Sequence, residues 1–434
     1  MSILNASDEN IISLRQPEVD PALVQRANEI RNRVIQFRNE EAGDFAAELE
    51  RTGKIPDALW NRIRELGFHK LTLPTWAGGE GLPLMLYFPI LEEVAHCHGT
   101  IRMIVHAYNS IWRTVGQGSD SQQKEWLPRM VNEGALVAFA LTEPGNGTGI
   151  DLRTTATPQA QGAKYVLNGV KHLITFAEEA SVLAVVAKME GEAGRGALTA
   201  FLIPQGRAGM NLTPMPHMMG DKGCSHAVIT FENCEVSADE VLGEVGEGFG
   251  VAVHGFLDQS RACIAQSAVG LAQEALDRTL EFVQKRVTFG KPIASRQAVQ
   301  MRIADMQIAI QATRLLCQDV ARKFDMGADI SLEASIAKAN AIQMVGDVTD
   351  SALALFGGMG YAMTSPVERL YRDARSLWFE EGTTETQKQT IAMELLANAR
   401  ERGRAGATAG RGPGAAGAAG TAGASGAASD GVRG

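Results

Sequence analysis

The apolar side chains of this chain of 434 residues change their spacing twice, and this change restricts the folds open to it. From about residue 22 to 131 they recur at helical intervals. From about 136 they form short runs bounded by turn residues, and after about 250 the helical interval returns. We therefore expect a helical domain, then a β domain, then a second helical domain.

The middle region has the pattern of a compact β domain. Asn168-Gly169 lies between two apolar runs and favours a hairpin turn there. The predicted strands cover residues 136–141, 165–167, 182–187, 198–203 and 227–231.

The last region predicts a helical bundle, because four long periodic segments follow one another with short connections. These segments are 262–286, 297–324, 332–356 and 386–400. The residues after them are rich in Gly and Ala and cannot bury enough apolar surface to offset the entropy of ordering. The expected domains are an N-terminal extension at 1–21, a helical domain at 22–131, a β domain at 132–245, a bundle at 246–400 and a disordered tail at 401–434.

Composition argues against several classes of protein. The net charge of −9 gives no general attraction to nucleic acid or to an anionic membrane. The five cysteines are widely spaced without a CxxC pair, so neither a metal site nor a disulfide framework is expected. The acidic N-terminus resembles no targeting peptide and no segment has the length of a membrane span, so we expect a cytoplasmic protein.

Three motifs carry groups suited to binding a ligand. Leu141–Gly149 (LTEPGNGTG) offers backbone N–H groups and hydroxyls to a planar heterocycle. Arg286–Pro292 (RVTFGKP) places a cation that could meet a pyrophosphate. Phe356–Tyr361 (FGGMGY) has glycines that allow close approach of a ligand. Glu381 stands directly before Gly-Thr, where an apolar pocket would raise its pKa and make it a better base.

Together, in this order and spacing, these motifs resemble the acyl-CoA dehydrogenase family over roughly residues 22–400. The resemblance implies an α+β, mainly α fold with a helical N-terminal domain, a β-barrel middle domain and a C-terminal four-helix bundle. It also implies a homotetramer with one FAD per subunit, held partly across a subunit interface. Electron-transfer flavoprotein is the implied electron acceptor.

The resemblance also implies a mechanism and a set of site residues. Glu381 matches the base that removes the α proton of an acyl-CoA while the β hydrogen leaves as hydride to flavin N5. The matching cofactor positions are Leu141, Thr142, Thr148, Thr175, Arg286, Thr288, Phe289, Gln297, Gly357, Gly358, Thr383 and Glu385. The matching substrate positions are Arg102, Thr148, Asp258, Arg261 and Gly382. Ser260 occupies the family's second location for a base and offers no carboxylate.

Two residues bear on the acyl group. Arg102 stands among apolar residues and aligns with the arginine that glutaryl-CoA dehydrogenases use for a distal carboxylate. Such a cation is costly to bury unless an anion meets it, which favours a glutaryl- or succinyl-type substrate. The competing interpretation pairs Arg102 with a protein acid. Glu380 is expected to face solvent, and a Glu380 in the pocket would neutralise Arg102.

Two other functions fit parts of the pattern. A non-oxidative lyase resembling sulfinopropionyl-CoA desulfinases shares the arginine near position 102, but that group lacks the base that Glu381 supplies. A flavin-fold protein that binds nucleic acid would need a basic patch, and the acidic composition argues against it. The leading hypothesis is a short-chain acyl-CoA dehydrogenase of fatty acid or amino acid catabolism.

Overall fold

The computed structural model describes residues 19–145 and 151–409. Its N-terminal domain is helical, as predicted. The first helix begins at Pro21, where the Asp20 side chain caps it by accepting a hydrogen bond from the Ala22 N–H at 2.9 Å. The helices are α2 (Pro21–Glu40), α3 (Ala42–Thr52), α4 (Asp57–Glu65), α5 (Leu84–Ala95), α6 (Gly99–Val115) and α7 (Asp120–Asn132).

The middle domain is one mainly antiparallel sheet with the order β6-β7-β3-β2-β4-β5-β8, and β1 pairs with β4. The implied barrel is not closed among the described strands, because the edge strands β6 and β8 each pair on one side. The strands are β1 (Val137–Ala140), β2 (Thr155–Gln159), β3 (Lys164–Thr175), β4 (Val182–Met189), β5 (Leu198–Pro204), β6 (Met210–Pro214), β7 (His226–Ser237) and β8 (Val241–Leu242).

The predicted hairpin at Asn168-Gly169 is wrong. β3 runs through both residues, and its register against β7 shifts between Leu167 and Gly169. Gly169 has φ of 147°, and a Cβ there would lie 2.5 Å from the Cα of Thr154. The glycine therefore serves a bulge and a close backbone approach rather than a turn.

The C-terminal region is the predicted helical bundle. α9 (Asp258–Lys285), α10 (Gln297–Asp325) and α11 (Ser331–Phe356) pack on one another, and α12 (Pro366–Ser376) packs on α11 and α9. The short α8 (Gly248–Ala252) and one π turn (Val253–Leu257) lead into α9, and the hairpin of β9 (Val287–Thr288) and β10 (Lys291–Pro292) follows it. α13 (Thr384–Ala409) ends beyond the predicted limit near 400, and its residues from Ala392 belong to a second unit.

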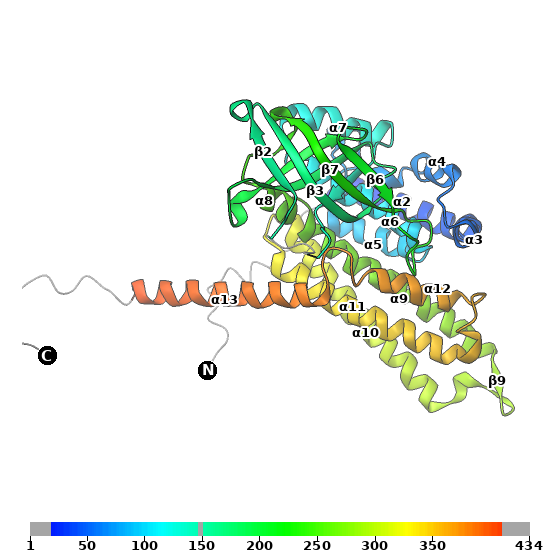
Figure 1. Cartoon of the computed structure of the whole chain (residues 1–434). Helices are drawn as coiled ribbons and strands as arrows, with labels where there is room; N and C mark the ends of the chain where they lie inside the picture. The colour runs from blue at the N-terminus through cyan, green and yellow to red at the C-terminus, as the bar shows by residue number, and fades with distance from the viewer. Residues whose placement is uncertain (1–18, 146–150, 410–434) are drawn as a thin grey trace, which may run out of the picture. The chain divides into compact units, whose positions relative to one another are not determined.

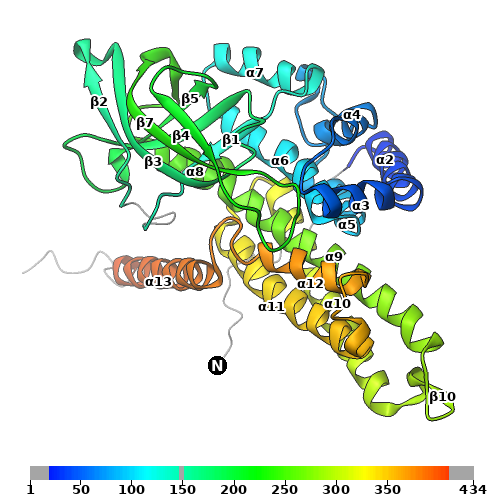
Figure 2. The ribbon, with the colours of Figure 1, turned by 45° about the vertical axis from the view of Figure 1, so that its right-hand side comes forward.

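Helix α6 lies between the sheet and the bundle, because it packs against both β1 and α9 (Figures 1 and 2). Most of its side chains are buried, including the polar Arg102, His106 and Asn109. Among the described helices, none combines the length and apolar character that crossing a membrane requires.

Candidate active site

The loop between α12 and α13 holds Glu381 in a strained backbone conformation. Glu381 has φ of 53°, in the left-handed region, and Gly382 follows with φ of 95°. A left-handed non-glycine residue costs roughly 1–2 kcal/mol. Such strain persists only where the surroundings fix the backbone, and it gathers at functional sites.

The carbonyl groups of this loop are fixed by side chains from the bundle. The Lys338 ammonium on α11 is fully buried and donates to the carbonyl oxygens of Glu380 and Gly382, the latter at 2.5 Å. Arg261 Nε and Gln387 Nε2 donate to the Glu381 carbonyl at 3.3 and 3.1 Å. These donors explain how the chain holds the strained turn.

The Glu381 carboxyl group is suited to act as a base. Ser260 Oγ donates to its Oε1 at 3.0 Å. Burial raises the pKa of Glu381 to about 7, although the Lys338 charge opposes the shift. A carboxylate with this pKa is both substantially ionised and basic near neutral pH.

Two predicted substrate residues lie close to this loop, and one of them, Arg261, contacts the Glu381 backbone. Asp258 and Arg261 are buried in the first turn of α9 and are paired, with Arg261 NH1 at 2.9 Å from Asp258 Oδ1. Asp258 directly follows the π turn, a helix irregularity that often marks functional sites. The structure therefore brings Asp258, Arg261, Glu381 and Gly382 together.

The predictions for Arg102 and Glu380 need correction. Glu380 does not face solvent: its side chain is 13% exposed and accepts two hydrogen bonds from Arg102, at 2.7 and 2.8 Å. Asp221 Oδ2 lies 3.3 Å from the Arg102 guanidinium, which is 4% exposed. Protein acids thus neutralise Arg102, and the argument that it awaits a substrate carboxylate no longer holds.

The loop after β1 places Leu141 and Thr142 at the end of the sheet. A buried pair holds it, since Lys171 Nζ donates to Glu143 Oε1 at 2.8 Å and to the Leu141 carbonyl at 2.9 Å. Thr175 lies at the end of β3, which is joined to this loop by the hydrogen bond from His172 N to Thr142 O. These three predicted cofactor residues therefore form one group.

A second group of predicted cofactor residues lies at the far end of the bundle. It comprises Arg286, Thr288, Phe289, Gln297, Gly357 and Gly358. Phe282, one turn before Arg286, stacks on Phe356 at 4.0 Å between ring centroids, which brings Gly357 and Gly358 to this end. Figures 1 and 2 show the β9–β10 hairpin well away from the sheet. Within one chain the two groups do not form a single site.

The remaining predicted cofactor positions lie in or beyond the Glu381 loop. Thr383 follows Gly382, and its hydroxyl lies 3.5 Å from that of Thr386. Glu385 is exposed in the first turn of α13. Thr148 lies outside the described residues.

Three functional neighbours of these groups were missed from the sequence: Lys338, Lys171 and His106. Lys338 is a lone cation in the apolar run of α11, which was a visible signal. His106 lies four residues from Arg102 and from Ser110, a spacing that places all three on one helix face. Lys171 carried no comparable signal, because its partner Glu143 is distant in sequence.

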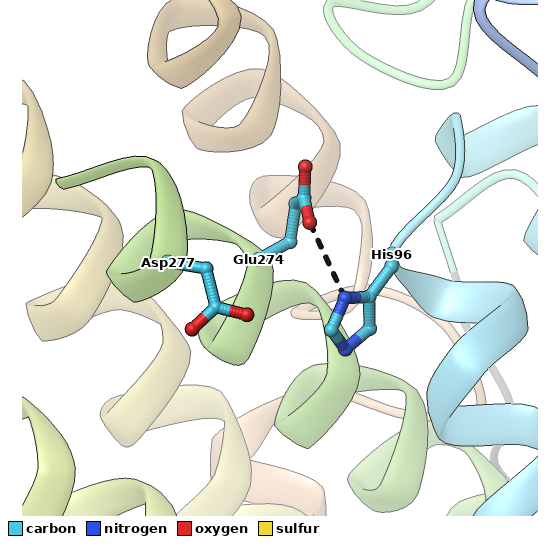
Figure 3. Close-up of side chains that lie close together, drawn as sticks. All are labelled: His96, Glu274 and Asp277. Atoms are coloured by element: carbon cyan, nitrogen blue, oxygen red, sulfur yellow. Dashed lines mark hydrogen bonds and ion pairs between the residues drawn. The ribbon is translucent and has the colours of Figure 1, made fainter. Parts of the chain in front are cut away.

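One other cluster has the composition of a metal site: His96, Glu274 and Asp277 (Figure 3). Its ligand atoms already have protein partners. Glu274 accepts from Arg278 Nε at 2.7 Å and lies 3.2 Å from His96 Nδ1, which also lies 3.1 Å from Arg38 NH1. Two guanidinium groups would repel a cation here, so the cluster is better explained as an ion-pair network that joins α2, the residue after α5, and α9.

Replacing Lys338 with methionine is expected to destabilise the protein. The change leaves the Glu380 carbonyl without its Lys338 donor, while the Gly382 carbonyl loses one of two donors and keeps Gln387 Nε2 at 3.2 Å. An unsatisfied buried group of this kind costs about 1–3 kcal/mol, so we expect a loss of about 2–3 kcal/mol in the free energy of unfolding, measured by urea denaturation. The matched control is Lys323→Met, which removes two partly exposed ion pairs, with Asp319 and Glu333, and should cost about 1 kcal/mol or less. Equal losses in both variants would contradict the structural role of Lys338.

Family models match nearly the whole described chain in three consecutive segments. The N-terminal domain of acyl-CoA dehydrogenase matches residues 25–134, the middle domain matches 138–234 and the C-terminal domain matches 246–396.

Individual relatives match at similar coverage. The human mitochondrial short-chain specific acyl-CoA dehydrogenase is 33% identical over 386 residues, 88% of this chain and 92% of the human protein. Acryloyl-CoA reductase (NADH) of Anaerotignum propionicum is 33% identical over 387 residues, 88% of this chain and 97% of that protein. The structure of butyryl-CoA dehydrogenase from Megasphaera elsdenii superimposes with a TM-score of 0.81 at 29% identity, covering 87% of this chain and 99% of that one.

Proposed function

The chain belongs to the acyl-CoA dehydrogenase family of FAD-dependent enzymes, and we propose that it dehydrogenates a short-chain acyl-CoA between Cα and Cβ with Glu381 as the base. The observation that carries this proposal is the Glu381 carboxyl, whose pKa is raised to about 7 in a strained loop held by Lys338 and Arg261. The names of the relatives, which include short-chain and butyryl-CoA dehydrogenases, support the acyl length.

The chemistry assigned to this chain is a proton transfer. Glu381 takes the α hydrogen as a proton, and the electron pair of that C–H bond forms the Cα=Cβ double bond as the β hydrogen leaves with its own pair. Bound FAD would supply the two-electron acceptor for that hydride. Ser260 holds one oxygen of Glu381, so the other oxygen is the one we assign to the α proton. Because Lys338 and Arg261 fix the loop carbonyls, the base needs little reorganisation at the moment of transfer.

The residues of the two cofactor groups fit FAD in their chemistry. In the part of the chain that the structure describes, no atom lies within 4 Å of where a Cβ of Gly357 or Gly358 would be, so a ligand can approach their backbone. Arg286 is an exposed cation suited to a pyrophosphate, and Phe289 is a 96% exposed aromatic ring. Thr142 and Thr175 offer hydroxyls to the heterocycle. We propose that a second copy of the chain, in a homotetramer, supplies the group at the bundle end.

We propose a neutral acyl group rather than a dicarboxylyl one. Arg102 is the cation that a distal carboxylate would need, and Glu380 and Asp221 already neutralise it. The non-oxidative lyase is disfavoured as well, because Glu381 retains the position and the raised pKa of a base. Electron-transfer flavoprotein remains our proposal for the electron acceptor.

The substrate proposal predicts a clear order among acyl-CoA thioesters. Butyryl-CoA should bleach the flavin of the purified holoenzyme with at least about 10-fold greater apparent kcat/KM than glutaryl-CoA, because Arg102, the cation that the second carboxylate would need, is already paired with protein acids. Absorbance of the oxidised flavin under anaerobic conditions measures the rate. Acetyl-CoA is the matched control, since it has no Cβ to oxidise. Equal or faster bleaching by glutaryl-CoA would refute the neutral acyl site.

The reverse direction is a second candidate, favoured by the similarity to an acryloyl-CoA reductase that uses NADH. The same base could return a proton to Cα of an unsaturated thioester, since its pKa of about 7 leaves it partly protonated at neutral pH. Oxidation of NADH by the holoenzyme with crotonyl-CoA, compared with reduction of a flavoprotein acceptor by butyryl-CoA, decides between the two directions.

A further inference from the structure

A series of hydrogen-bonded side chains leads from Ser110 on helix α6 through His106 and Ser260 to the Glu381 carboxyl. We call this series the hydrogen-bond relay. Ser260 Oγ lies 3.0 Å from Glu381 Oε1 and 3.1 Å from His106 Nε2. On the other side of the imidazole, His106 Nδ1 lies 3.1 Å from Ser110 Oγ. Ser260 and Ser110 are completely buried and His106 is 3% exposed, so water does not compete for these contacts.

When Glu381 is ionised, the O–H and N–H groups of this relay can donate in a single direction. An ionised carboxylate only accepts hydrogen bonds, so the Ser260 hydroxyl must donate its single hydrogen bond to Glu381. The Ser260 oxygen then accepts from His106, which requires the proton of the imidazole to be on Nε2. His106 Nδ1 in turn accepts from the Ser110 hydroxyl. Every member therefore donates toward the carboxylate, an arrangement in which each bond polarises the next.

We propose that His106 and Ser260 are positioning residues that orient and stabilise the ionised form of Glu381, and this rests on the proposed function of Glu381 as the base. Ser260 restrains Oε1 and leaves Oε2 for the substrate. His106 fixes which way the Ser260 hydroxyl points. Without the Nε2 proton, Ser260 could donate to the imidazole instead and withdraw its hydrogen bond from the base.

His106 does not take up the proton that Glu381 removes from the substrate. Burial and the nearby Arg102 charge lower the pKa of His106 to about 4, whereas that of Glu381 is raised to about 7. A proton taken from the substrate therefore stays on Glu381. The titratable and charged groups facing the relay are Lys338 from α11, Arg261 and Cys263 from α9, Arg102 from α6 and Glu380 from the loop itself. None of these changes in the variants below. Burial lowers the pKa of Lys338 to about 7, so its charge changes in the same pH range in wild type and in the variants.

The relay is tested by the pH dependence of flavin reduction in the holoenzyme. Wild type should lose activity as pH falls through about 7, when Glu381 becomes protonated. We call this loss of activity on the acid side the acid limb. Ser260→Ala removes a hydrogen bond to the ionised form of Glu381, so the pH midpoint of the acid limb should rise by about 1–2 units. His106→Leu should raise this midpoint by a smaller amount. His106→Gln keeps an N–H donor and should have the same midpoint as wild type.

The matched control is Ser267→Ala, which removes a buried hydroxyl from the same helix; its oxygen has no hydrogen-bond partner among the described residues. This variant should keep the wild-type acid limb. A Ser260→Ala limb that coincides with those of wild type and Ser267→Ala would overturn the relay. A merely structural role for Ser260 would lower stability or rate at every pH without moving the limb.

A second measurement does not depend on turnover. Nitrogen-15 NMR of histidine-labelled holoenzyme above the acid limb should show the His106 proton on Nε2, with the His106→Gln spectrum assigning the signal. A proton on Nδ1 would overturn the proposed direction of the relay. Failure of the base assignment is distinguished by Glu381→Gln: if that variant still reduces flavin, the proposed function fails, and if it is inactive while the tautomer is wrong, only the relay fails.

Discussion

Replacing Glu381 with glutamine is expected to reduce substrate-driven flavin reduction by at least about 10³-fold. Glutamine has nearly the same shape and can still receive the hydrogen bond from Ser260, but it cannot accept the α proton. Positioned general bases contribute about 10²–10⁴-fold to the rate. Position 260 holds a serine, which has no carboxylate that could replace Glu381.

The measurement is rapid mixing of the holoenzyme with butyryl-CoA, observed at the flavin absorbance. Glu281→Gln, an exposed acid on α9, is the matched control and should retain wild-type rates. The visible spectrum of Glu381→Gln should show bound flavin, which separates loss of the base from loss of the cofactor. Retention of more than about a tenth of the rate would exclude Glu381 as the base.

The same variant has an expected signature in stability. The pKa of Glu381 rises from 4.5 to about 7 on folding, so between these values the folded state binds more protons than the unfolded state. The contribution of Glu381 to stability therefore falls as pH rises through this window. Glu381→Gln cannot titrate, and its melting temperature relative to wild type should be higher at pH 8 than at pH 5.

The candidate base was predictable because its signal is local. Glu381 and the glycine that permits its turn are neighbours in the sequence, and the motifs around them keep a fixed order. The groups that position Glu381 come from distant parts of the sequence. Lys338 comes from α11 and Ser260 from α9, and only the packing of these helices brings them to the loop.

The wrong predictions share this cause. The sequence pattern of α6 correctly placed Arg102 in an apolar environment, but it contains no information on which acid lies opposite. Glu380 is 278 residues away, and its direction depends on the strained turn that follows it. The hairpin predicted at Asn168-Gly169 failed similarly, because a glycine that suits a turn also suits a bulge against Thr154.

Replacing Arg102 with leucine is expected to be the most destabilising single change at the candidate site. It leaves Glu380 and Asp221 buried without their cation, and removing one member of a buried pair costs about 3–5 kcal/mol. Asp221 is the better able to adapt, since burial already raises its pKa to about 7 and it can become protonated. Glu380 cannot adapt as readily, because its ionised form is the one that the structure favours: its pKa lies below the ordinary value owing to Arg102.

The double variant Arg102→Leu/Glu380→Leu separates the lost ion pair from lost packing. Replacing a buried pair by apolar residues is often neutral, so the second change should recover about half or more of the loss caused by the first, as measured by urea denaturation. Arg129→Met is the matched control, because it breaks partly exposed ion pairs with Glu133 and Glu125 and a cation–π contact with Trp126, for an expected loss of about 1 kcal/mol. If Arg102→Leu were as stable as this control and selectively lost activity toward glutaryl-CoA, Arg102 would be a substrate residue after all. Loss of stability without such selectivity is the result expected of an internal anchor that holds Glu380, and with it the neighbouring base, in place.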